Sequence, residues 1–263
     1  MTSLTSESTE SVESADLAAY CLMLGDDALI MSHRLQEWCA RAPEIEEEVA
    51  LANIALDLLG QARLLLTMAG EAEGAGRDED RLAFFREAAE FRNVRFTETT
   101  GDFAVAMTGL LVFATWRLAV FGGLTRSRDA GLAAVAKKAV KELAYHRDHA
   151  AQWVVRLGDG TDVSHRRAQL AWDSILAGAA ELLHAHPVEL RMAAAGIGVD
   201  PATARPELEQ VLAQVAAAAT LRHRQLPEPP RGGTGRYGEH SAAMPALLGE
   251  LQSVARAHPE ATW

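Results

Sequence analysis

The sequence FAVAMTGLLVFATWRLAVFG, residues 103–122, decides how the rest of the chain must fold. Apolar side chains occupy most positions all around the helix that this stretch would form, which indicates a helix buried on nearly every side. Its length would almost span a bilayer, but Arg117 lies inside it and it lacks a basic flank, so we interpret it as a core helix rather than a membrane helix. Between Phe103 and Arg128 there is no Asp, Glu, His or Cys, so this helix offers a metal ion no strong ligand.

The remaining sequence predicts helices that would surround this one. Proline and glycine interruptions, capping residues such as Asp102, and apolar spacings of three and four residues mark their ends. The predicted helices run from Ser14 or Asp16 to about Ala40, Ile45 to about Ala69, about Asp80 to Glu90, Ser127 or Asp129 to about Leu157, about Ser164 to Leu183, Asp200 or Pro206 to about Arg222, and Ser241 to Ala257. Four long helices with modest connections predict an all-α fold, a four-helix bundle with additional C-terminal helices.

The composition narrows the classes of partner and compartment. A formal net charge of -11 provides no basic stripe for a phosphate backbone, so we expect no nucleic-acid partner. Cys21 and Cys39 fall on one predicted helix, about 27 Å apart at the helical rise, which is beyond disulfide reach. We interpret both thiols as core packing and expect a reducing, cytoplasmic location. Residues 1–14 are acidic and lack a signal-peptide pattern, so we predict a disordered tail there and a single domain over residues 15–263.

Polar residues follow one side of two of the predicted helices. Four-residue steps place them in rows on otherwise apolar helices, and buried polar groups need partners. We predict a buried polar network made of Asn53, Asp57, Gln61, Lys138, Glu142 and His146. If Asp57 is fully buried, Asp57→Ala should cost about 3 kcal/mol. The network has a structural interpretation, a polar ladder that sets helix register, and a functional one, a metal or proton-transfer site; we favour the structural one.

The carboxylates and histidines do not match a di-iron bundle. Such a site takes a Glu from each of two helices and a Glu-x-x-His from each of the other two. Asp57 is the only carboxylate between Val49 and Gly70, and no histidine occurs between Arg34 and Tyr145. Glu142, His146 and His149 on one helix would hold a single metal ion at best. The one true Glu-x-x-His, at Glu181 and His184, ends a predicted helix, and we interpret it as facing solvent.

Specific strings of the sequence resemble the phenylacetyl-CoA epoxidase C subunits. The strings ALANIALDLLGQARLLL (50–66), KELAYHRDHAAQWVVRLGDGT (141–161) and the terminal GRYGEHSAAMPALLGELQSVARAHPEATW (235–263) carry this resemblance, which runs from about Asp16 to Trp263. The resemblance implies a ferritin-like helical subunit that pairs with a homologous catalytic oxygenase subunit in a larger hetero-oligomer with a reductase and small accessory subunits. It implies no cofactor in this chain: di-iron is expected in the catalytic partner, and flavin, an iron–sulfur centre and NADPH in the reductase.

The resemblance also implies positions where the catalytic relative keeps metal ligands. Its two Glu-x-x-His motifs fall on Leu58 to Gln61 and on Leu143 to His146, where only His146 retains a ligand type. We therefore predict degenerate metal-site positions at Leu58, Gln61, Leu143 and His146, and no catalytic, cofactor-binding or metal-binding residue. The chain is then expected to be a structural subunit in the ring epoxidation of phenylacetyl-CoA. The alternative is a self-sufficient metal-binding oxygenase in which Asp57, Glu142, His146 and His149 hold iron.

Overall fold

Four long helices form the body of the protein in the computed structural model, which describes residues 3–228 and 234–261, with side chains from residue 14 onward. They are α1 (Ser3–Gln36), α2 (Ile45–Glu73), α4 (Phe103–Leu124) and α5 (Ala130–Gly158). Helix α1 packs on α2 and α4 packs on α5, and the two pairs meet where α2 contacts α5. The described residues contain no β-strand, so the fold is the all-α, ferritin-like bundle expected.

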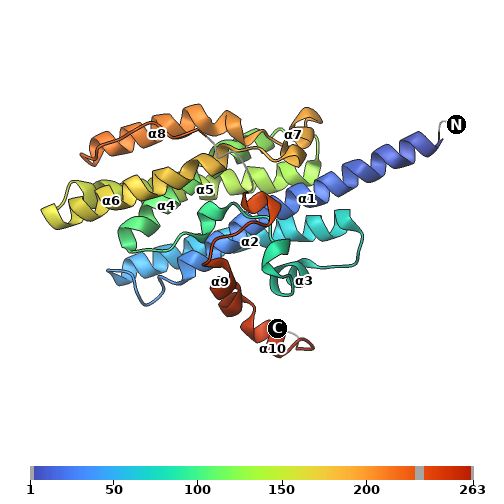
Figure 1. The fold of residues 1–263 in the computed structure, drawn as a ribbon, viewed down its shortest axis with the longest axis horizontal. Coiled ribbons are helices and arrows are strands. Elements are labelled where there is room, and N and C mark those ends of the chain that lie inside the picture. The colour runs from blue at the N-terminus through green and yellow to red at the C-terminus, as the bar shows by residue number, and fades with distance from the viewer. Residues whose placement is uncertain (1–2, 229–233, 262–263) are drawn as a thin grey trace.

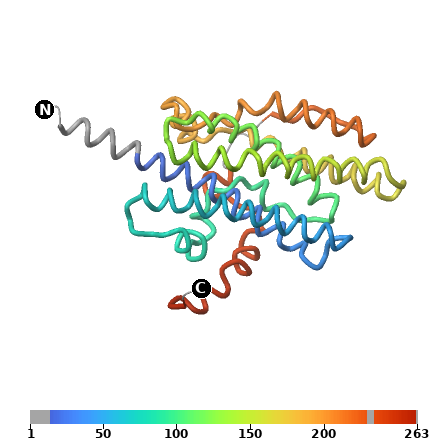
Figure 2. Tube along the Cα trace, turned by 180° about the vertical axis from the view of Figure 1, so that it is seen from behind, coloured from blue at the N-terminus to red at the C-terminus, as the bar shows by residue number. Residues whose placement is uncertain are grey.

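Shorter elements extend the bundle on two sides (Figures 1 and 2). Helices α6 (Asp162–Ala179) and α8 (Arg205–Ala218) lie on one side, where both contact α4, and α9 (Met244–Leu251) and α10 (Ser253–Ala257) project on the opposite side (Figure 1). The connecting elements are α3 (Glu79–Phe84), α7 (Pro187–Ala194) and the 3-10 turns η1 (Ala88–Glu90), η2 (Arg95–Glu98), η3 (Ala180–Leu183), η4 (Pro201–Ala204) and η5 (Gly235–Tyr237).

Helix α4 is the core helix that its sequence predicts. Two helices, α2 and α4, are long and apolar enough by length and composition to cross a membrane, but 72% of the apolar window of α4 is buried inside the protein, against 44% for α2. Asp102 accepts a hydrogen bond from the backbone N–H of Val105 and so starts α4, and Asp129 does the same for α5 through Leu132. Trp116 and Trp172 are buried in the core, whereas Trp153 is only partly buried.

Several predicted helices differ from those observed at their ends. Helix α1 ends at Gln36, and Ala40 adopts a positive φ of 67°, so Cys39 lies beyond the helix and is exposed. The prediction of core packing is confirmed for Cys21 and wrong for Cys39. The helix predicted around 80–90 is two elements, α3 and η1, and the predicted final helix is divided at Gln252 into α9 and α10. Helix α7 was not predicted. The tail predicted over residues 1–14 lies almost entirely among residues whose side chains are not described, and it stays a prediction.

Candidate functional site

The polar residues of α2 and α5 meet where these helices cross the middle of the bundle. His146, on α5, is completely buried, and its Nε2 lies 3.0 Å from Oδ2 of Asp57 on α2. Burial lowers the pKa of His146, the Asp57 carboxylate opposes this shift, and the Arg117 charge adds to it. The neutral ring then donates through Nε2, while Nδ1 has no partner among the described residues. Because the native pKa is depressed, stability is highest above the ordinary histidine range and falls as the ring is forced to protonate on acidification.

A second polar contact lies one turn away. Gln61 on α2 donates from Nε2 to Oε2 of Glu142 on α5 at 3.0 Å. Its Oε1 accepts a hydrogen bond of 3.1 Å from Nε of Arg117, and Arg117 also donates to the carbonyl of Leu24 on α1. Gln61 therefore contacts two other helices, α4 and α5, through one amide group.

Arg117 occupies the centre of these contacts, a role that was not predicted from the sequence. It is fully buried, and burial lowers the pKa of its guanidinium to about 10, with Asp27 opposing the shift. Its charge stacks over the ring of Phe121 at 4.3 Å, and its Nη1 has no hydrogen-bond partner among the residues described. The signal in the sequence was the single charge inside an otherwise apolar helix, because such a charge must find buried partners.

Two members of the predicted buried network are not buried. Asn53 is exposed, and the side chain of Lys138 is 64% exposed, so the prediction of burial is wrong for both, although Lys138 still lies 3.5 Å from Glu142. The reason is geometric: a four-residue step overshoots a helical turn of 3.6 residues by about 40°. A row that faces α5 at Gln61 has therefore rotated toward solvent by Asn53.

Asp57 is only partly buried, which changes the expected cost of removing it. Its side chain is 39% exposed, so the value of about 3 kcal/mol for a fully buried group no longer applies. We expect Asp57→Ala to lower the free energy of unfolding by about 1 kcal/mol, the worth of one hydrogen bond that water partly replaces. Urea unfolding of the variant measures this cost. A loss of about 3 kcal/mol or more would mean that Asp57 is sealed from solvent when the protein is in solution.

The residues at the centre do not fit a di-iron group. Leu58 and Leu143 are both completely buried, and they occupy the positions where glutamate ligands are expected in a catalytic relative. Hydrocarbon coordinates no metal, and the Arg117 guanidinium places a positive charge near His146. The described residues contain no group of three or more His, Cys, Asp or Glu placed to share a metal ion.

His149 belongs to a separate cluster. It lies 2.7 Å from Oε1 of Glu47, a buried carboxylate near the start of α2, and Trp153 donates to the other oxygen of Glu47. The four residues of the alternative iron site, Asp57, Glu142, His146 and His149, are therefore engaged by three different sets of partners.

Two buried ion pairs join α1 to distant parts of the chain, one to the segment after α3 and one to the C-terminal segment, residues 234–261. Asp26 pairs with Arg86, and Asp27 pairs with Arg236, all four side chains being almost fully buried. Arg236 also lies 3.5 Å from Glu189. Burial opposes the charge of Arg236, but the Asp27 and Glu189 carboxylates together raise its pKa above the ordinary value.

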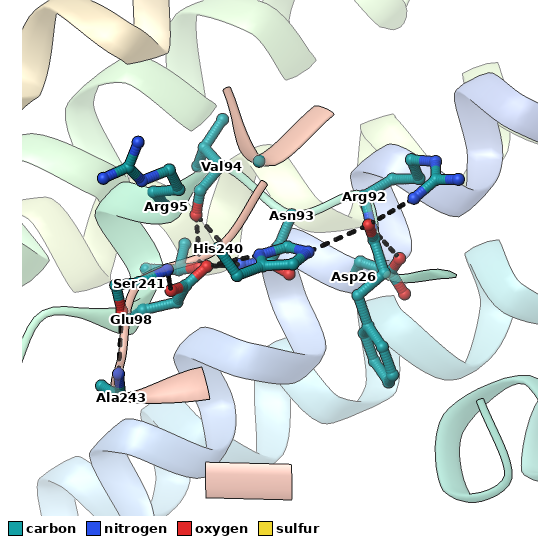
Figure 3. A network of polar contacts seen from close by, with 12 residues as sticks. Asp26, Arg92, Asn93, Val94, Arg95, Glu98, His240, Ser241 and Ala243 are labelled. Carbon is teal, nitrogen blue, oxygen red and sulfur yellow. Dashed lines mark hydrogen bonds and ion pairs between the residues drawn. The ribbon is translucent and has the colours of Figure 1, made fainter. Parts of the chain in front are cut away.

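A polar network around Glu98 extends this attachment (Figure 3). Its buried carboxylate accepts hydrogen bonds from His240 and from the backbone N–H of Ser241, each at 2.7 Å, and from Asn93 at 3.1 Å. Burial would raise the pKa of Glu98, but the hydrogen bonds from His240 and Ser241 outweigh it and lower the pKa. The ionised carboxylate thus stabilises the fold, and that contribution is lost as the pH falls below the ordinary glutamate range.

Glu181 binds backbone groups inside the protein, contrary to its prediction as a solvent-facing residue. We expected it to face solvent, but its carboxylate accepts hydrogen bonds from the backbone N–H groups of Arg95, Phe96 and Gly235 at 3.0 to 3.1 Å. It therefore ties η3 to η2 and to the C-terminal segment. No sequence pattern could reveal this role, because all three partners are backbone groups distant along the chain.

The fold and its centre define a ferritin-like helical protein whose bundle interior is filled by buried leucines and by the hydrogen-bonded side chains of Gln61 and Arg117. The chain belongs to the phenylacetic acid catabolic protein family, whose model matches residues 1–263. It is 41% identical over 249 residues to the C subunit of the 1,2-phenylacetyl-CoA epoxidase of Escherichia coli (strain K12), a match that spans 94% of this chain and 99% of that protein.

Proposed function

We propose that this chain is a non-catalytic subunit of a multicomponent phenylacetyl-CoA epoxidase in aerobic phenylacetate catabolism, and that it pairs with and stabilises a homologous di-iron subunit. The observation that carries this proposal is the complete burial of Leu58 and Leu143 at the positions of the expected ligands. The resemblance to a protein named as a subunit of this enzyme supports the reaction to which the chain contributes. The di-iron centre then resides in the partner, and flavin, an iron–sulfur centre and NADPH in a reductase.

The outer face of α2 supports a role in pairing. We define the α2 stripe as its exposed apolar residues, of which Ile45 is 72% and Leu56 61% exposed; the full set is Ile45, Val49, Leu56, Leu59 and Leu64. This stripe explains why less than half of the apolar window of α2 is buried. An exposed apolar stripe of this length is typical of a surface that a partner covers.

The charges around the α2 stripe indicate what kind of surface covers it. Glu44 and Glu46 are exposed at the beginning of the stripe, and Arg63 is exposed near its other end. Helix α5 runs antiparallel to α2, so the exposed Lys138 and Lys141, near the beginning of α5, also lie at that other end. A complementary surface carries apolar residues between a basic end and an acidic end. We propose that a helix of the homologous catalytic subunit provides this surface.

The test is the assembly of the complex. We expect Leu56→Asp to reduce the amount of catalytic subunit that co-purifies by about tenfold or more, since it buries a charge in an apolar interface. The matched control is Leu170→Asp, because Leu170 is 70% exposed on α6 and lies on a different helix. Native mass measurement of the complex distinguishes the outcomes. Equal assembly of both variants would contradict docking on α2, and loss of a homodimer instead would assign the stripe to a second copy of this chain.

The non-catalytic part of the proposal has its own test. We expect His146→Ala to leave the turnover of the reconstituted epoxidase within about threefold of the unsubstituted complex, because a neutral buried ring whose side-chain hydrogen bond among the described residues goes to Asp57 performs no chemical step. Metal analysis should find iron in the catalytic subunit and less than one iron per copy of this chain after dialysis. Lost turnover with normal assembly, or stoichiometric iron in this chain alone, would support the self-sufficient oxygenase instead.

A further inference from the structure

A partly open cavity of about 180 Å³ lies away from the centre of the bundle. It is bounded by the end of α1, by the segment from η2 to the start of α4, and by α6. None of Leu58, Gln61, Leu143 or His146 lines it, so it is separate from the positions of the expected metal site.

The floor of this cavity is apolar. Met31, Leu35, Phe96 and Ile175 line it, and each is at most 6% exposed. Gly109 of α4 also lines it, and a Cβ added there would meet only the Ile175 side chain, at 3.7 Å, so the missing side chain leaves the floor open. An apolar cavity of about 150 Å³ in another protein is large enough to take benzene. The whole cavity, floor and mouth together, is therefore of a size to take one aryl group.

The mouth of the cavity is polar and carries a positive charge. Arg34, Arg41, Thr99 and Thr100 line it together with one acidic residue, Glu37, which pairs with Arg34 at 2.5 Å. Two guanidinium groups and one carboxylate leave an excess of one positive charge, in a chain whose formal net charge is -11. Because Arg34 is paired with Glu37, the excess charge is that of Arg41. A guanidinium group favours an anionic oxygen ligand.

We propose that this cavity binds small carboxylic acids that carry an aryl group, with the ring on the apolar floor and the carboxylate at Arg34 and Arg41. The two halves of the cavity select for the two ends of such a molecule. An uncharged aryl compound leaves the arginines without an anion, and a short aliphatic acid leaves the floor unfilled. Binding at this cavity is independent of the proposed pairing, because none of the α2 stripe residues lines it.

Calorimetric titration of the full-length chain tests this proposal with three probes: phenylacetate, phenylacetamide and acetate. We expect saturable binding of phenylacetate, with phenylacetamide and acetate each about tenfold or more weaker, because a hydrogen bond to a charged group and a buried ring each contribute more than the roughly 1.4 kcal/mol that a factor of ten represents. Binding of phenylacetamide as tight as that of phenylacetate would overturn the assignment of the arginines. No saturable binding of phenylacetate up to about 10 mM would overturn the whole proposal.

Variants place the ligand in the cavity. Ala106→Leu fills the cavity from α4, Arg41→Gln removes a charge from its mouth, and Ala134→Leu is the matched control at an exposed position of α5. We expect the first two to raise the dissociation constant for phenylacetate about tenfold or more and the control to leave it unchanged. Thermal melting confirms that each variant is folded, and Arg41→Gln keeps the test decisive if Ala106→Leu does not fold. Unchanged affinity in the folded variants would place binding elsewhere and contradict the proposal.

Discussion

Asp27→Ala is expected to lower the free energy of unfolding by about 3 to 5 kcal/mol, the cost of removing one partner from a buried ion pair. The Asp27 carboxylate accepts from both Nη atoms of Arg236, at 2.9 and 2.8 Å, and from the backbone N–H of Val94 at 2.8 Å. Its removal leaves the Arg236 guanidinium buried with only Glu189 as a charged neighbour within 4 Å among the described residues. It also leaves the buried backbone N–H of Val94 without its hydrogen-bond acceptor. Chemical denaturation, followed by circular dichroism at a fixed pH, measures the loss.

The matched control is an ion pair at the surface. Asp16 pairs with Arg191, whose side chain is 54% exposed, so Asp16→Ala should change the free energy of unfolding by no more than about 1 kcal/mol. A comparably small effect for Asp27→Ala would show that the C-terminal segment can leave α1 without unfolding the bundle. In that case a protease would cleave the C-terminal segment of the variant faster, while the unfolding midpoint stayed unchanged.

The sequence could predict elements whose signals are local. The apolar pattern of residues 103–122 identified the core helix. Asp102 marked one helix start, and Asp129, one of two candidates beside Ser127, marked another, because an N-cap acts within three residues. Asp57 and His146 were both predicted members of the buried polar network, and the structure brings them into contact, since both lie in polar rows on helices that a bundle brings together. The prediction of burial failed for Asn53 because it treated residues four apart as facing the same direction. Each step of four residues in fact turns the side chain by about 40° around the helix, and Asn53 is two steps from Gln61.

The buried ion pairs of Asp26 and Asp27 could not be predicted from spacing. Asp27 and Arg236 are separated by 209 positions along the chain, and Asp26 and Arg86 by 60. Two adjacent acidic residues, Asp26 and Asp27, are typical of a solvent-exposed turn of a helix. Their spacing does not indicate which basic residue pairs with each of them. Pairing of this kind is determined by the tertiary fold, because a buried carboxylate is tolerated only where the fold brings a donor to it.

Leu143→Glu is expected to lower the free energy of unfolding by about 4 kcal/mol or more. Leu143 is completely buried, so the variant loses the roughly 1.5 to 3 kcal/mol that burial of a leucine side chain provides, and it places a carboxylate in an apolar, fully enclosed position. Leu143→Met keeps the volume and the apolar character, so it should cost less than about 1.5 kcal/mol. The comparison separates the effect of charge from that of altered packing.

The same variant distinguishes a packed centre from a latent metal site. A second carboxylate beside His146 would increase the number of possible ligands, but Leu58 still supplies none and the charge of Arg117 still acts on His146. We therefore expect added ferrous iron, under anaerobic conditions, to leave the unfolding midpoint of Leu143→Glu unchanged. A rise in that midpoint with iron concentration, absent in Leu143→Met, would show that metal binds the folded state. The side chains at the bundle centre would then still have the arrangement of a metal site, which would contradict the interpretation of this centre as a packed apolar core.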